Sequence, residues 1–70
     1  SSVAEWAAVG VPEQWVPVLN KCGYYLVQDI REVKAQKLQQ DVCGVNKKYK
    51  LGYDNPKVEE FQQWIDNVNK

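Results

Sequence analysis

The residues of this sequence that could bind a ligand are concentrated between positions 44 and 50. The candidates, which follow an apolar helical pattern, are Gly44, Val45, Asn46, Lys47, Lys48, Tyr49 and Lys50. Glycine adopts positive φ at no steric cost and asparagine is the next most tolerant type, so Gly44 to Asn46 predict a tight turn between two helices. Unpaired N–H groups beside a helix N-terminus and lysines attract anions. The stretch therefore predicts a phosphate-binding site, at which Tyr49 or Tyr53 could stack on an unpaired base.

A structural interpretation of the same residues remains open. Lysines that follow a turn are commonly solvated, and Tyr49 and Tyr53 could simply cover a small core. Binding to tRNA or single-stranded RNA at low salt distinguishes the two interpretations, because only phosphate contacts depend on these lysines.

Side chains for catalysis are scarce. The sequence contains no His and no Thr, and its only serines are Ser1 and Ser2, so the usual hydroxyl nucleophiles and their commonest general base are missing. Pairs such as Glu59 and Glu60 have the spacing of carboxylates on a solvated helix face. We predict no catalytic residue and no cofactor site.

The two cysteines do not form a metal-binding pattern. Cys22 and Cys43 are far apart, there is no Cys-x-x-Cys motif, and no histidine is available as a further ligand. Each follows an apolar helical run and precedes a glycine, which is typical of a structural thiol packed under a turn. A disulfide and a reactive thiol remain as alternatives, and no metal site is predicted.

Charge is unevenly distributed along a chain whose formal net charge is zero. Residues 31–57 carry seven basic and three acidic side chains, a net charge of +4, whereas residues 1–30 and 58–70 each carry −2. A neutral total argues against tight binding to duplex DNA, which requires the neutralisation of many phosphates. The middle third is therefore the expected basic face, and it could contact only a few phosphates.

Hydrophobic periodicity predicts an all-α domain. Helices are expected over residues 3–9, 26–33 and 34–42, and another that starts at 12 or 16 and ends at 22. A single turn is expected over 47–51, and a last helix follows a cap at Asp54 or Asn55 and ends at 68. Pro17 requires either a kink near Trp15 or a helix start near Val16. The expected core consists of Trp15, Leu19, Leu38, Phe61 and Ile65.

Composition is that of one globular domain, with 44% apolar and 26% charged residues. No apolar run approaches the ~20 residues of a membrane span, and no secretory signal is present, so no membrane partner and a cytoplasmic location are expected. The absence of Met and the Ser1-Ser2 start lead us to expect a single helical domain over residues 1–70, excised from a longer protein.

Two family resemblances follow from these motifs. Leu19-x-x-x-Gly23-Tyr24-x-x-Val27-x-Asp29-Ile30, then Leu38, then Val42-x-Gly44-Val45-Asn46-Lys47 resembles the double helix-hairpin-helix pattern of SAM-like domains, as in the C-terminal domain of the RNA polymerase alpha subunit. The resemblance covers residues 15–51. It implies a compact SAM-like bundle of about five short helices with two hairpin turns, the second of which contacts a nucleic-acid phosphate. Asn46 stands where that pattern has its second glycine.

The second resemblance is narrower. Gly10-Val-Pro-Glu-Gln-Trp15, Cys43-Gly-Val-Asn-Lys-Lys-Tyr-Lys-Leu-Gly52, Asn55-Pro56 and Trp64-Ile65 resemble a C-terminal extension of some bacterial lysyl-tRNA synthetases. It implies a non-catalytic accessory module next to tRNA, with ATP, lysine and magnesium as ligands of an absent catalytic domain.

A protein-interaction or purely structural SAM-like module is the alternative to nucleic-acid contact. Trp6, Tyr24 and Tyr25 are the candidates for an exposed apolar patch that binds a partner or the parent protein's other domains.

Overall fold

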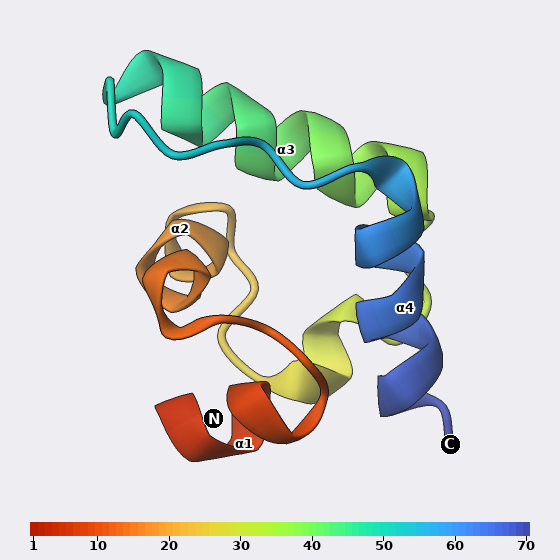
Figure 1. Cartoon of the computed structure of the whole chain (residues 1–70). Coiled ribbons are helices and arrows are strands. Elements are labelled where there is room, and N and C mark those ends of the chain that lie inside the picture. Colours follow the sequence, from red (N-terminus) through yellow and green to blue (C-terminus); the bar gives the residue numbers. More distant parts are fainter.

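A computed structural model describes all residues, 1–70, and every regular element in it is helical. The elements are α1 (Val3–Ala8), the 3₁₀ turn η1 (Glu13–Trp15), α2 (Val16–Lys21), the 3₁₀ turn η2 (Val27–Ile30), α3 (Ala35–Lys48) and α4 (Val58–Val68). The longest helix, α3, forms one edge of the molecule and packs mainly against α4 and α2 (Figure 1). The predicted all-α class is confirmed. None of the helices has the length and apolar character needed to cross a bilayer.

The first half of the chain follows the local signals in its sequence. Ser2 and Glu5 form a capping box at the start of α1, and Gly10 ends that region with φ of +92°. Helix α2 begins at Val16, so Pro17 occupies its second position, where the missing N–H has no helical partner to lose. Of the two predicted starts for this helix, the one near Val16 is confirmed.

Helix α3 differs from the prediction. A helix over 34–42, a turn at Gly44 to Asn46 and a new turn over 47–51 were expected, whereas Ala35–Lys48 is one continuous helix. Gly44 is not among the glycines with positive φ. The row of buried residues on this helix continues through Val42 to Asn46, one turn later. Tertiary packing therefore keeps the helix intact. The predicted turn at Gly44 is wrong, and the chain reverses instead at Lys50 and Gly52, with φ of 53° and 77°.

Asn46 holds the returning chain against α3. Its side chain is 6% exposed. Its Nδ2 donates to the carbonyl oxygen of Tyr53 and to Oδ1 of Asn55, both at 2.8 Å, and its Oδ1 accepts from the Tyr53 N–H at 3.3 Å. Residues 49–57 consequently run back alongside α3 to the start of α4 (Figure 1). A polar side chain in the core is tolerated here because its amide is hydrogen-bonded.

Helix α4 begins later than predicted. Its N-cap is Lys57, without a side-chain hydrogen bond, not Asp54 or Asn55. The side-chain oxygen of Asn55 instead accepts a hydrogen bond from Asn46, and Pro56 is buried before the helix starts. The acidic pair Glu59 and Glu60 does lie in the first turn, as expected of side chains that favour the positive end of a helix.

One hydrophobic core joins all four helices. The five predicted core residues are all buried in it: Trp15, Leu19, Leu38, Phe61 and Ile65. Trp6, which was predicted as part of an exposed patch, is fully buried in the same cluster. A short amphipathic helix has only one face to bury, and Trp6 is the one side chain of α1 that supplies it.

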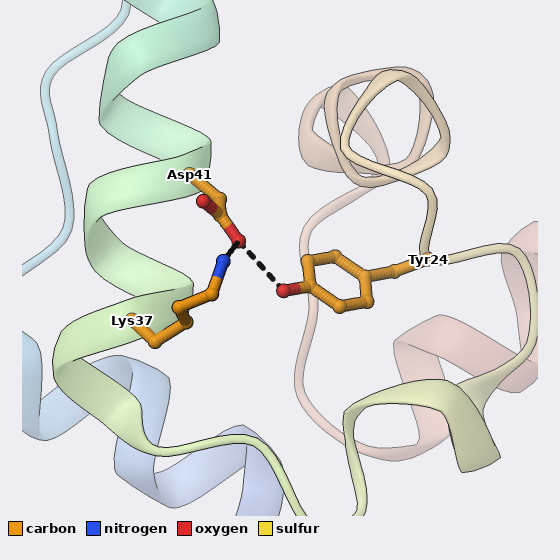
Figure 2. Close-up of polar contacts among 3 residues, drawn as sticks. All are labelled: Tyr24, Lys37 and Asp41. Atoms are coloured by element: carbon orange, nitrogen blue, oxygen red, sulfur yellow. Dashed lines mark hydrogen bonds and ion pairs between the residues drawn. The ribbon is translucent and has the colours of Figure 1, made fainter.

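A polar contact fixes the end of α2 against α3. The hydroxyl group of Tyr24, in the connection after α2, donates to Asp41 Oδ2 at 2.7 Å, and Lys37 Nζ donates to the same oxygen at 2.8 Å (Figure 2). Burial of the Asp41 carboxylate acts to raise its pKa, but the two hydrogen bonds outweigh burial and lower the pKa below its usual value. The same contact raises the pKa of Tyr24, with burial as the larger cause.

Asn46→Ala tests the hydrogen bonds to the returning chain. We expect the free energy of unfolding to fall by about 2 kcal/mol, because the Tyr53 and Asn55 groups lose their partner, even though alanine favours the helix. Urea unfolding monitored by Trp fluorescence measures the change. Gln40→Ala, on the exposed side of the same helix, is the control and should change stability by less than about 0.5 kcal/mol. Equal effects of the two substitutions would contradict the role of Asn46.

Tyr24→Phe tests the contact with Asp41. At pH 7 we expect a loss of about 1 kcal/mol, because a hydrogen bond to a charged acceptor is removed. A carboxyl pKa lowered by folding stabilises the protein above the unfolded-state pKa of about 4, and this contribution is lost as pH falls through the lower, folded-state value. The difference between variant and parent should therefore shrink as pH falls below about 4 in thermal unfolding curves.

The matched control for this experiment is Tyr25→Phe. Tyr25 is 60% exposed and its hydroxyl group has no protein partner. The stability of the Tyr25→Phe variant should therefore equal that of the parent at every pH. A Tyr24→Phe variant as stable as Tyr25→Phe would show that the contact with Asp41 contributes nothing.

Candidate nucleic-acid interface

The predicted binding residues fall into two groups in the structure. Gly44, Val45 and Asn46 lie inside α3, where backbone N–H groups donate to carbonyls one turn earlier. They therefore present no free N–H groups to a ligand. The end of α3 at this point is its C-terminus, whose carbonyls carry partial negative charge, the opposite of the anion-binding end that the sequence predicted. Backbone recognition of a phosphate is not possible in this arrangement.

The residues of the second group are consecutive in the chain, at the end of α3. Lys47 and Lys48 are in the last turn of α3, Tyr49 is its C-cap, and Lys50 follows directly. Lys21, in the last turn of α2, joins them: its Nζ lies 4.7 Å from the centre of the Tyr49 ring, and Lys48 Nζ lies 5.6 Å from it. Both distances are within the range of cation–π attraction. The Tyr49 ring thus contacts Lys21 and Lys48. Together with Lys47 and Lys50, which are next to Lys48 and Tyr49 in the chain, these two residues are called the lysine cluster here: Lys21, Lys47, Lys48 and Lys50.

The lysine cluster has no acidic partner in the chain. The single ion pair of the structure joins Lys37 to Asp41, at a different place on α3. None of the four ammonium groups of the cluster donates a hydrogen bond to another protein group. Their charges are therefore not paired within the chain, and they concentrate positive charge in a molecule whose formal net charge is zero.

Lys50 occupies a backbone position that favours glycine. Its φ of 53° places it in the left-handed region at the residue after the C-cap. The Leu51 N–H donates to the Asn46 carbonyl at 3.0 Å, and the Lys50 N–H to the Lys47 carbonyl at 3.2 Å, which is the hydrogen-bond pattern of a Schellman motif. Glycine is the usual residue there, and a lysine raises the free energy of the turn by roughly 1 kcal/mol.

The two tyrosines proposed for stacking have different surroundings. Tyr53 packs edge-on against Trp15, with ring centres 5.3 Å apart and an interplanar angle of 71°, so it covers the core. Tyr49 is 49% exposed and contacts the lysines of the cluster. The contact with Trp15 supports the structural interpretation for Tyr53, which is 37% exposed. Tyr49 is the more exposed of the two, and Lys21 and Lys48 lie over its ring.

Both cysteines are free and partly buried against the core. Burial raises the pKa of the Cys22 thiol to about 11, with a further contribution from the charge of Asp41, and burial also raises the pKa of Cys43. At neutral pH both side chains are thiols, which are poor nucleophiles. This favours a structural role over the alternative of a reactive thiol.

The predicted apolar docking patch is only partly present. Trp6 is buried and Tyr24 is half-buried in its contact with Asp41, but Tyr25 is exposed. Two further apolar side chains, Leu26 and Val3, are also exposed. They lie in neighbouring segments, because the Val27 N–H donates to Ser1 Oγ at 2.9 Å and so joins the start of α1 to η2.

Sequence reasoning missed Lys21. Its charge was counted with the net-negative residues 1–30, and no motif links it to residues 47–50, more than twenty positions later. Its position before Gly23 is the usual place for a cation at a helix C-terminus, which was the only available signal. The contact with Tyr49 arises from the packing of α2 against α3.

The strained position of Lys50 can be tested by substitution. We expect Lys50→Gly to raise the free energy of unfolding by about 0.5–1 kcal/mol, since glycine adopts positive φ without steric cost but loses more backbone entropy. Lys48→Gly is the matched control: the same substitution at a right-handed helical position should lower stability by a similar amount. Chemical denaturation measures both, and changes of the same sign would refute the assignment of Lys50 to the turn.

Comparison with known proteins places these residues in a family context. The chain is 48% identical over 60 residues to a lysine–tRNA ligase of Porphyromonas gingivalis strain W83, and 47% identical over 60 residues to the same enzyme of a second strain of that species. The match covers 86% of this chain but 10% of each ligase, so the chain spans about a tenth of the length of these relatives. No protein-family model matches the chain, and no solved structure matches it. The relatives support the lysyl-tRNA synthetase resemblance, and no family model supports the SAM-like one.

Proposed function

We propose that this chain is a non-catalytic accessory segment of a lysine–tRNA ligase and that its lysine cluster contacts tRNA. The observation that carries this proposal is the approach of Lys21 and Lys48 to the exposed ring of Tyr49, next to Lys47 and Lys50 in the chain, with no carboxylate paired to any of the four lysines. The relatives that match most of this chain are enzymes named for their action on tRNA, a polyanion.

The cluster has the chemistry of a weak phosphate-binding surface. Each lysine that neutralises a phosphate releases a counterion, so four lysines correspond to a salt dependence with a slope of at most about −3 to −4 in log K against log salt. Lysine ammonium groups act as flexible point charges and do not read bases. Such a surface would add affinity to a larger protein without adding sequence specificity.

Lys50 gives independent support. A residue that breaks a local backbone rule without a compensating contact in the chain is typical of a functional position. Lys50 occupies a left-handed position where glycine would be more stable, and its ammonium group makes no ion pair in the chain. A side chain at this position thus has a cost in backbone energy, as expected if a partner uses its charge.

The mechanism differs from that suggested by the sequence. The backbone of Gly44, Val45 and Asn46 is engaged within α3, so side chains alone supply the proposed contacts. Tyr49 is the aromatic residue next to the lysine cluster, and its ring would stack on an unpaired base after displacement of Lys21 or Lys48 from its face.

Docking to the other domains of a parent ligase is a second candidate function. It is favoured by the exposed apolar side chains of Tyr25, Leu26 and Val3, which leave water only if another surface covers them. The two functions are compatible, because this patch and the lysine cluster involve different residues.

The triple variant Lys47→Gln, Lys48→Gln, Lys50→Gln tests the proposed tRNA contact. We expect fluorescence anisotropy with labelled bacterial tRNA at low salt to show weaker binding, with a log–log salt slope reduced by about 3. Lys34→Gln, Lys57→Gln, Lys70→Gln is the matched control, which removes the same charge from outside the cluster.

If both triple variants lose the same affinity, only total charge matters and the assignment to the cluster is wrong. Undiminished binding by the first variant would reject nucleic-acid contact by these residues altogether. Lys21→Gln, tested alone, should reduce the log–log salt slope of tRNA binding by about 1 if Lys21 also contacts a phosphate.

A further inference from the structure

Gly44 lies at an unexpected place for a glycine. It is exposed in the second half of a fourteen-residue helix, where glycine is among the least favourable residues. The buried positions Ala35, Leu38, Val42 and Asn46 form the core stripe of α3. Because a helix turns about 100° per residue, Gly44 lies nearly opposite this stripe, at the middle of the outer face.

No feature of the chain itself requires this glycine. Its φ is not positive, and a Cβ atom added to it would meet no atom within 4 Å. Gly10 shows the contrast: its φ is +92°, and an added Cβ would lie 3.4 Å from Asn67 Nδ2. Alanine at position 44 would therefore fit the folded chain and favour the helix, so any requirement for glycine must come from outside the chain.

The outer face around Gly44 has no exposed acidic residue, and the partly exposed Asp41 lies three residues before Gly44 on the helix surface. The exposed residues of this face are Gln36, Lys37, Gln40, Gly44, Lys47 and Lys48. The one acidic residue of α3, Asp41, is bonded to Lys37 and Tyr24. Lys47 and Lys48 follow Gly44 by three and four residues and are therefore its neighbours on the helix surface. In Figure 1 no other segment is drawn beyond this edge of the molecule.

We infer that the outer face of α3 receives the sugar–phosphate backbone of the RNA, with Gly44 as the point of closest approach. This inference rests on the proposed function and adds the direction from which the ligand comes. Glycine exposes the peptide backbone, so a bulky strand can come close to the helix axis at this position. The adjacent ammonium groups of Lys47 and Lys48 then reach phosphates on either side of the contact.

A size series at position 44 tests the inference. Gly44→Ala and Gly44→Gln add increasing volume without charge, and both residues favour helix, so the variants should fold with a melting temperature raised by about 4–8 °C. Affinity for labelled bacterial tRNA should nevertheless fall in order of side-chain size, by about tenfold or more for Gly44→Gln. The control Gln40→Ala lies one turn earlier on the same face and adds no volume, so it should bind as the parent does.

The outcomes separate this inference from the proposed function. If Gly44→Gln binds tRNA as tightly as the parent while the Lys47, Lys48, Lys50 variant does not, the lysine contact stands and the close approach at Gly44 is overturned. If neither variant loses affinity, both are overturned. Higher thermal stability together with weaker binding, for Gly44→Ala and more so for Gly44→Gln, is the result that supports close approach.

Discussion

The buried amide of Asn46 is the interaction on which the second half of this fold depends. It supplies two donors and one acceptor to residues seven and nine positions later, and so requires a continuous α3 on one side and a returning chain on the other. An amide in the core is stable only when it is hydrogen-bonded. The late start of α4, the reversal at Lys50 and Gly52, and the contact of Tyr53 with Trp15 are all consistent with this requirement.

Continuity of α3 also determines what the basic surface can do. A new helix that began after a turn at Gly44 would have offered its first N–H groups to an anion, but the single helix that ends at Lys48 presents carbonyls there instead. Those carbonyls favour nearby cations, and a Schellman turn satisfies the last of them. The positive charge of this region therefore lies on exposed lysine side chains, and the proposed contact with phosphate depends on those side chains.

The contact between Tyr24 and Asp41 holds together the two segments that carry the lysine cluster, the end of α2 and the end of α3. It holds the connection after α2 against α3 (Figure 2), and Lys21, at the end of α2, then reaches the ring of Tyr49. The proposed interface is therefore a product of helix packing and not of a contiguous motif. In a chain of zero net charge, this local cluster is the feature that gives a polyanion a preferred side from which to approach.

The sequence by itself determined the helical class, the ends of the early helices and the core. Local sterics determine the chain direction at Gly10 and the start of α2 near Pro17. Periodicity along the chain determines which face of α4 is buried, the one with Phe61 and Ile65. Tertiary structure decided the rest. Gly44 to Asn46 have the local preferences of a turn, but Asn46 finds partners at Tyr53 and Asn55 that no local pattern reveals, and the helix continues. Lys21 joins the candidate site, and Trp6 leaves the surface, for the same reason: burial and contact depend on residues distant in sequence, which only the packed core brings together.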